Sequence, residues 1–531
     1  MARLVIRSGK VIDGAGNPWF ESDLEVAGEK ISHIGKASAS RAKAIDASGL
    51  FVAPGFIDIH SHSDLDVLVN PKAESKVRQG VTTEVFPNCG SGPAPLRGAA
   101  VELVKEELKE LGLSLDWASM AEYMRRIERR GISLNVALLI PHGTLRACVV
   151  GFENRKPTKK DMREMKALAG RCMCEGAFGM CTGLRYVPGS YAETDEVVEL
   201  LRVVGKYSGF YASHVRDEGD RGTYPAAIAE AVEIGEKAGV PVEISHLKAL
   251  GRRAWGKVKD ALKIIEDARM RGVDVTCDMY PYQASGTGFM AWVPKWSHEG
   301  GFDKFLERLR DPELKRKIME ETRAVLDDRG GPEKAVLTRF PPNALYEGKT
   351  LQEISTMKSK DPVETILELI VEARGETPVV NFNMSDDNVR TVMKHPAVMF
   401  GTDGYSLAPY GILSRGKPHP RSYGTYPRVL GKYVRDEGLL KVEDAIRKMT
   451  SLPAQRLGLH DRGLIREGMY ADLVVFDPEV VRDKATFTDP HQYPEGVEYV
   501  IVNGTTVIEK GKHTGALPGK VLRKSHAKSK R

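Results

Sequence analysis

Short apolar runs alternate with amphipathic stretches through the middle of the chain. Helical spacing of apolar residues occurs at Val101–Leu111, Asp195–Val204, Ala226–Ala238 and Lys257–Met270. Repeated strand–helix units predict an α/β fold with a parallel sheet, and at this size a TIM-like (β/α)8 barrel over residues 54–460. The strand-like runs are 56–60, 81–86, 134–140, 177–182, 209–214, 241–246, 272–278, 378–384 and 397–402. Because nine runs compete for eight places, we expect that one of them is wrongly assigned as a strand or lies outside the barrel.

Both ends of the chain have the pattern of β-structure. Apolar runs between turn residues occur at Leu4–Ile6 and Ala471–Phe476, and Asn503-Gly504 is typical of a hairpin turn. We therefore expect residues 1–53 and 461–522 to pair into one small β-sandwich domain. The barrel would then be inserted between the two halves of that domain.

The strand–helix rhythm breaks between Gly286 and Ala344. This stretch contains Trp292, Trp296 and a charged helical run near Phe305–Leu326, and it is too long for an ordinary loop. We expect residues 286–344 to form an inserted subdomain beside the active-site mouth, where it is placed to act as a lid. The alternative is a peripheral unit with no part in catalysis.

Charge and composition exclude several classes of protein. The formal net charge is +6, and residues 523–531 carry five positive side chains and no acidic one, which leaves about +1 for the remainder. This distribution does not support a nucleic-acid-binding face, and we expect a solvated basic tail, with weak polyanion contact as the alternative. The sequence contains no apolar run of membrane-spanning length and no signal-like start.

The cysteines indicate a reducing compartment. Six cysteines in 531 residues do not form a disulfide framework. Cys172-Met-Cys174 lacks the CxxC spacing of a zinc or redox pair, and we interpret it as structural. Together with the missing signal segment, this favours a cytoplasmic protein, and nothing in the sequence reports its oligomeric state.

Potential metal ligands follow several of the strand-like runs. His60 ends the first run and His62 follows it, and alternate residues of an extended segment share a face. Cys89, His214, His246 and Asp403 lie at or just after later runs. The carboxyl ends of barrel strands line the active site, and imidazole, thiolate and carboxylate are zinc ligands. The set therefore predicts a metal-dependent enzyme, although each residue taken alone is more often structural.

At these positions the chain resembles the amidohydrolase superfamily, and within it the N-acyl-D-amino-acid deacylases, also called D-aminoacylases. The resemblance spans nearly the whole chain. Its most specific parts are Asn88-Cys89-Gly90 and the segment beginning His419-Pro420-Arg421. The matching segments are Ala53–His62, Arg78–Thr83, Asn88–Gly90, Thr182–Leu184, Ser213–Glu218, Ile244–Lys248, Tyr280–Tyr282, Gly401–Gly404 and His419–Thr425.

The resemblance implies particular metal ligands. A cysteine takes the place of the carboxylated lysine of related enzymes such as dihydroorotases. Cys89, His214 and His246 would bind one tight zinc ion, and His60, His62 and Asp403 would complete a second, weaker site. Three protein ligands leave one position open for water or substrate.

The resemblance also implies how a substrate would be held and cleaved. Asp403 would act as general base and then general acid. Four residues would bind the α-carboxylate of the substrate, and each has a structural or surface role as its alternative. These residues are Lys248, Tyr280, Ser285 and Arg421. Arg185 follows Thr182-Gly183-Leu184 and could favour acidic D-amino acids, although a solvated or structural arginine is the alternative.

The expected activity is zinc-dependent hydrolysis of N-acyl-D-amino acids, with a small-molecule substrate as partner. A cyclic-amide hydrolase or a dipeptidase on the same metal site is the nearest rival. A cyclic imide without a free carboxylate would not need Arg421. The predicted carboxylate-binding residues, called here the carboxylate clamp, therefore distinguish a deacylase from a cyclic-amide hydrolase. A non-catalytic binding or assembly protein is more remote, because all six candidate ligands are present. A nucleobase deaminase does not fit the context of Cys89.

Overall fold

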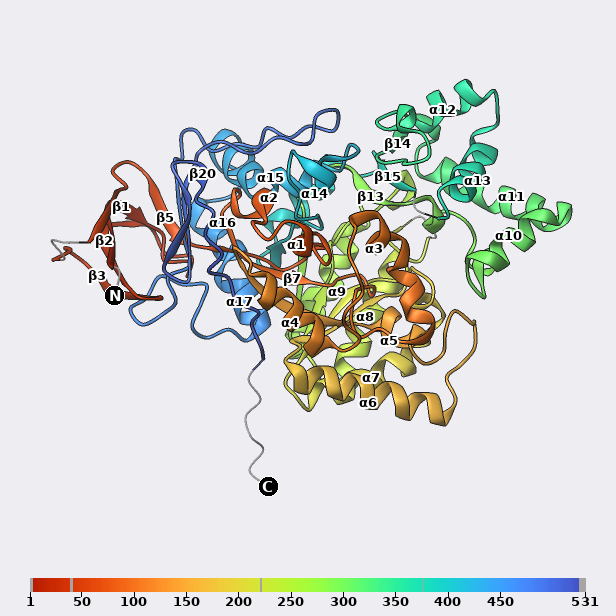
Figure 1. Cartoon of the computed structure of the whole chain (residues 1–531), viewed down its shortest axis with the longest axis horizontal. Coiled ribbons are helices and arrows are strands. Elements are labelled where there is room, and N and C mark those ends of the chain that lie inside the picture. Colours follow the sequence, from red (N-terminus) through yellow and green to blue (C-terminus); the bar gives the residue numbers. More distant parts are fainter. Residues whose placement is uncertain (1–2, 39–41, 220–221, 376, 525–531) are drawn as a thin grey trace.

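A computed structural model describes residues 3–38, 42–219, 222–375 and 377–524. Figure 1 shows three parts: a sheet built from both ends of the chain, a central barrel, and a smaller unit that projects from the far side of the barrel. Most of the predicted basic tail lies outside the described residues. No helix in the described ranges is long and apolar enough to cross a membrane.

Eight parallel strands form the barrel, and each corresponds to one of the predicted runs. Their order in the sheet is β6, β7, β8, β9, β10, β11, β12 and β16. The strands are β6 Phe56–Asp58, β7 Val81–Phe86, β8 Asn135–Pro141, β9 Gly179–Gly183, β10 Phe210–His214, β11 Val242–Ile244, β12 Val275–Met279 and β16 Val398–Phe400. Backbone bonds just beyond the first and last strands close the ring: Asp403 N–H donates to the His60 carbonyl at 2.8 Å and His62 N–H to that of Gly404 at 2.9 Å.

Alternation along these strands divides their side chains between two apolar clusters. One cluster contains Ile57, Val85, Leu139 and Ala212 with Leu457 of α17 (Ser451–Leu457), so this helix closes the barrel interior at the end away from the candidate ligands. The other cluster packs against the surrounding helices. The outer helices include α3 Lys105–Leu111, α4 Met120–Arg130, α6 Lys159–Glu175, α7 Thr194–Gly205, α8 Tyr224–Ala238, α9 Val258–Met270, α14 Asp386–Lys394, α15 Arg421–Arg428 and α16 Val442–Met449.

Helix α4 shows why these segments form helices. Ser119 accepts a hydrogen bond from the Glu122 N–H, and the Glu122 side chain accepts one from the Ser119 N–H, which together make a capping box. Met120, Tyr123, Met124 and Ile127 recur at helical spacing and are the buried residues of this helix. The amphipathic pattern therefore places one face against the barrel.

The two ends of the chain form one nine-stranded sheet, as their patterns predicted. The junction is β5 against β17, which pair antiparallel from Phe51 opposite Phe476 to Pro54 opposite Leu473. Apolar side chains from both ends, such as Ile6 and Ile501, share one cluster. The strands are β1 Arg3–Val11, β2 Phe20–Ala27, β3 Lys30–Ile34, β4 Lys43–Asp46, β5 Phe51–Pro54, β17 Leu473–Phe476, β18 Val497–Val502, β19 Thr505–Glu509 and β20 Lys512–His513.

The ninth apolar run belongs to the inserted unit. It forms β15 (Pro378–Asn381), which pairs with β13 (Ser285–Gly288) and β14 (Ala335–Leu337) in a separate three-stranded sheet. Helices α10 (Phe302–Arg310), α11 (Pro312–Asp328), α12 (Leu351–Lys358) and α13 (Pro362–Glu372) complete the unit. Its own core includes Phe305, Ile354 and Val379. The predicted range 286–344 therefore ends too early, because α12, α13 and β15 share this core.

The charged run near Phe305–Leu326 forms two helices instead of one. Pro312 cannot donate a backbone hydrogen bond and starts a new helix. Asp311 accepts hydrogen bonds from the N–H groups of Glu313 (2.9 Å) and Leu314 (3.0 Å) and so caps α11.

Candidate metal centre

The structure brings all six predicted ligands to the carboxyl ends of the barrel strands. His214 is the last residue of β10, and the other five follow β6, β7, β11 and β16 by a few residues. Cys89, His246 and Asp403 have left-handed backbone φ values of 55°, 37° and 48°. Residues other than glycine seldom adopt this conformation, and where they do the strain is often part of a functional site.

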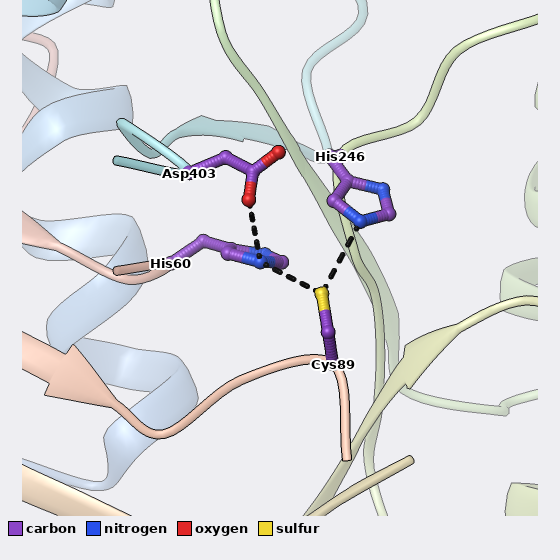
Figure 2. Close-up of side chains that lie close together, drawn as sticks. All are labelled: His60, Cys89, His246 and Asp403. Atoms are coloured by element: carbon purple, nitrogen blue, oxygen red, sulfur yellow. Dashed lines mark hydrogen bonds and ion pairs between the residues drawn. The ribbon is translucent and has the colours of Figure 1, made fainter. Parts of the chain in front are cut away.

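The Cys89 sulfur lies at the centre of the cluster. It is 3.4 Å from His60 Nε2, 3.5 Å from His246 Nε2 and 3.3 Å from His214 Nδ1. Figure 2 shows the sulfur between His60 and His246, with Asp403 directed at His60. Nitrogen and sulfur donors of one tetrahedral zinc ion are about 3.3–3.6 Å apart. The spacing around the sulfur therefore fits a shared zinc ion.

The remaining donors lie close to these side chains. Asp403 Oδ1 lies 3.0 Å from His62 Nε2 and 3.4 Å from His60 Nε2. His214 Nδ1 and His246 Nε2 are 2.8 Å apart, closer than two nitrogens on one zinc ion. One group of donor atoms belongs to His60, Cys89, His246 and Asp403, all within 4.8 Å of one another.

Two glycines allow Cys89 to approach the barrel. A Cβ atom on Gly183 would lie 1.9 Å from the Cys89 carbonyl oxygen, and one on Gly90 would lie 2.4 Å from the Gly183 nitrogen. Gly90 also has a φ of 77°. The Asn-Cys-Gly and Thr-Gly segments therefore pack directly on each other, and side chains there would displace the sulfur.

The electrostatics of the cluster keep His246 neutral and Asp403 ionised, which are their metal-binding forms. Burial and the nearby Asp403 carboxylate raise the pKa of the Cys89 thiol well above its usual value, and coordination to a metal ion reverses this effect because it deprotonates the thiol. Burial and Lys248 lower the pKa of His246, which keeps its imidazole in the neutral, metal-binding form. Burial alone would raise the pKa of Asp403, but Arg421 and the histidines hold it well below its usual value.

A cavity of about 590 Å³ opens at this cluster. Lys248, Ser285 and Arg421 line it and are themselves mostly buried. Tyr280 does not line it; its ring lies beneath the two cations, 4.7 Å from the Arg421 guanidinium carbon and 5.7 Å from Lys248 Nζ. Arg421 Nη1 donates to Asp403 Oδ2 at 2.7 Å. The residues predicted to bind the substrate carboxylate therefore lie beside the candidate metal ligands, and the Tyr280 ring packs against Lys248 and Arg421.

Other parts of the chain complete the cavity wall. Arg185 is 3% exposed and lines the cavity, so the solvated reading of this residue is wrong. The inserted unit contributes Thr287, Arg329 and Val379. This unit therefore forms part of the wall of the site and is not a remote attachment.

Sequence reasoning missed a set of buried charges around the ligands. His60 Nδ1 lies 3.0 Å from Asp278 Oδ2, and the backbone N–H of His246 donates to Asp278 Oδ1 at 2.9 Å. Beneath the cluster, Lys76 Nζ donates to Asp58 Oδ2 at 2.8 Å and lies 3.0 Å from Glu84 Oε1. Asp278 is the last residue of the predicted run 272–278, and its position at a strand end could have identified it as a candidate site residue. Nothing in the local sequence distinguishes Lys76 from a surface lysine.

An eight-stranded parallel barrel with histidine, cysteine and carboxylate donors at its mouth defines a metal-dependent hydrolase of the amidohydrolase class. Residues 43–508 match the model of the family described as "Amidohydrolase family". The chain is 35% identical to the D-aminoacylase of Alcaligenes xylosoxydans xylosoxydans over 525 residues, which cover 99% of this chain and 98% of that protein.

Two further relatives support the same family assignment. An N-acyl-D-glutamate deacylase of the same organism is 35% identical over 524 residues, covering 98% of this chain and 96% of that protein. The crystal structure of the N-acyl-D-glutamate deacylase from Bordetella bronchiseptica matches with a TM-score of 0.82 and 32% identity, covering 98% of this chain and 99% of that one. The chain belongs to the D-aminoacylase group of the amidohydrolase family and is a metal-dependent enzyme of the N-acyl-D-amino-acid deacylase type. The family and fold class predicted from the motifs are confirmed.

Proposed function

We propose that this enzyme hydrolyses the amide bond of N-acyl-D-amino acids, releasing a carboxylate and a free D-amino acid. The observation that carries the proposal is the position of two buried cations, Lys248 and Arg421, in the same cavity as the metal donors. An arginine can bind a carboxylate with two parallel hydrogen bonds, and a lysine adds a point charge. The cavity thus combines a centre for amide hydrolysis with a holder for the α-carboxylate of a linear substrate.

Zinc is the cofactor in this proposal. Cys89, His214 and His246 would hold the tight ion. His60, His62 and Asp403 would complete a second, weaker site next to Cys89. The Bordetella bronchiseptica relative was crystallised in complex with zinc and a phosphonate inhibitor. When bound, the ion polarises the amide carbonyl and makes water more acidic.

Asp403 would move the proton. Its Oδ1 faces the donor cluster while its Oδ2 is held by Arg421 at 2.7 Å. An ionised carboxylate in this position accepts a proton from the attacking water and then passes it to the leaving amine. Lys248, Arg421 and Ser285 would hold the α-carboxylate, and Tyr280 would support both cations from below.

The test is release of free amine from matched N-acetyl-D- and N-acetyl-L-amino acids by zinc-loaded protein, with a chelator-treated control. We expect zinc-dependent release from the D series. Cleavage of cyclic amides or dipeptides with no release from either N-acetyl series would keep the metal centre and overturn the proposed substrate.

Replacing Arg421 with methionine should raise KM by about 10–100-fold, the effect of losing a hydrogen bond to a charged group. Because Arg421 also contacts Asp403, kcat should fall as well. Steady-state kinetics with an N-acetyl-D-amino acid measure both constants.

Arg428 provides the matched control. It pairs with Asp483 at 2.9 Å and lies 4.7 Å from the ring of Tyr282, as Arg421 lies over Tyr280, but it is outside the cavity. Arg428→Met should keep the wild-type KM. A wild-type KM in Arg421→Met would remove this residue from carboxylate binding.

Arg185 should influence the choice of substrate side chain. A cation in the cavity wall attracts an acidic side chain, and one curated relative is an N-acyl-D-glutamate deacylase. We expect Arg185→Met to lower kcat/KM for N-acetyl-D-Glu about tenfold relative to N-acetyl-D-Met. Competition between the two substrates gives this ratio directly, and an unchanged ratio would mean that Arg185 has only a structural role.

A further inference from the structure

Glu218 connects the two proposed zinc histidines with the proposed carboxylate clamp. It lies four residues after His214, is 5% exposed and lines the cavity. Its Oε2 is 3.4 Å from His214 Nε2, and its Oε1 is 3.5 Å from His246 Nδ1 and 2.5 Å from Lys248 Nζ. A single buried carboxylate therefore faces both rings and the lysine.

The two histidines present opposite nitrogens to Cys89 and to Glu218. His214 directs Nδ1 to the sulfur and Nε2 to Glu218, while His246 directs Nε2 to the sulfur and Nδ1 to Glu218. Both nitrogens that face Glu218 are buried and have no hydrogen-bond partner among the described residues, so the Glu218 oxygens at 3.4 Å and 3.5 Å are the acceptors that they face. A ring that binds a metal through one nitrogen carries a proton on the other, and that N–H needs an acceptor.

A second metal ion between these three side chains is the competing interpretation, since His214, Glu218 and His246 form a group of potential ligands. Lys248 argues against it. Its ammonium group lies 2.5 Å from Glu218 Oε1, so a cation already occupies this side of the carboxylate. An added metal ion there would be repelled by the ammonium charge.

We propose that Glu218 is a positioning residue that fixes both zinc histidines and Lys248 with one carboxylate. This role rests on the proposed zinc ligands and on the proposed clamp. The carboxylate sets which nitrogen of each ring is free to bind the ion. Lys248 directs one donor to Glu218 and one to the His246 carbonyl at 3.3 Å, which leaves the third of its three donors for a substrate carboxylate. Zinc affinity and substrate binding are thereby coupled through the contacts that this one side chain makes with the two rings and with Lys248.

Zinc affinity measured by competition with a chromophoric chelator tests the proposal without relying on turnover. Glu218→Gln should lower zinc affinity about 10–100-fold, the usual effect of losing an acceptor behind a metal-bound histidine, and should also raise KM in the zinc-loaded enzyme. Lys248→Met should raise KM without lowering zinc affinity. Glu218→Asp keeps the charge near Lys248 but cannot reach both rings, so it should lower zinc affinity with a smaller change in KM.

Glu196 is the matched control. This buried carboxylate also faces a histidine and a cation, His142 Nε2 at 3.4 Å and Arg146 Nε at 3.1 Å, and none of the three lines the cavity. Glu196→Gln should leave zinc affinity and KM unchanged.

Zinc affinities of both Glu218 variants equal to that of the wild type would overturn the role of Glu218 alone. A wild-type protein that binds no zinc would overturn the proposed function and this role with it. Thermal melting of the metal-free proteins reports whether each variant is folded. If Glu218→Gln is not folded, the zinc affinity of Glu218→Asp still tests the proposal.

Discussion

Asp403→Asn is expected to lower kcat by about 10²–10⁴-fold while leaving a zinc ion bound, because the amide cannot accept the proton of the attacking water. Asparagine has nearly the same shape, so the contact with Arg421 at 2.7 Å can be kept through the amide oxygen. The proposed ligands of the tight ion, Cys89, His214 and His246, are unchanged in this variant. Single-turnover release of amine, together with the zinc content of the purified variant, measures both effects.

Asp386→Asn provides the control for this substitution. Asp386 also pairs with an arginine, Arg390 Nε at 2.6 Å, but at the start of α14 and outside the cavity. It should retain the wild-type rate. A variant Asp403→Asn with most of the wild-type rate and with zinc bound would remove Asp403 from proton transfer.

The periodic pattern predicted the barrel because each strand is covered on both faces and is therefore almost continuously apolar. The same property explains the ambiguity over the ninth run. Residues 378–381 are also apolar and strand-forming, but they pair with β13 and β14. Whether such a run joins one sheet or another depends on partners more than 40 residues away, which local periodicity does not report.

The candidate ligands were predictable because their positions follow from the fold. His60, Cys89, His214 and Asp403 come at strand ends, and a barrel brings strand ends together. The residues that support them were not predictable in the same way. Glu218 occurs in a polar loop segment, and its role depends on His246 and Lys248, which follow the next strand of the ring, β11.

Lys76 is the clearest case of a residue whose importance the sequence hides. It lies in a short helix, α2 (Glu74–Val77), among charged neighbours that suggest a surface. In the structure its side chain is fully buried and lies against Asp58 and Glu84. It also donates to Thr402 Oγ1 at 2.6 Å and to the Gly404 carbonyl at 3.2 Å, on both sides of Asp403.

Lys76→Met should therefore lower the free energy of unfolding by about 3–5 kcal/mol, because it leaves two buried carboxylates without their cation. Burial alone would lower the pKa of Lys76, but Asp58 and Glu84 raise it, so the ammonium form is the one that holds these groups. Equilibrium unfolding in urea, followed by intrinsic tryptophan fluorescence, measures the change.

Lys263→Met is the control that distinguishes the loss of a buried lysine from the loss of an exposed one. Lys263 pairs with Asp267 at 3.1 Å on the outer face of α9, where its side chain is 73% exposed. Its replacement should change stability by no more than about 0.5 kcal/mol, as is usual for surface positions. If Lys76→Met were as stable as Lys263→Met, the two carboxylates would have to be neutral or hydrated in the folded protein. The segments that carry His60 and Asp403 would then be held together by their backbone bonds and not by the buried lysine.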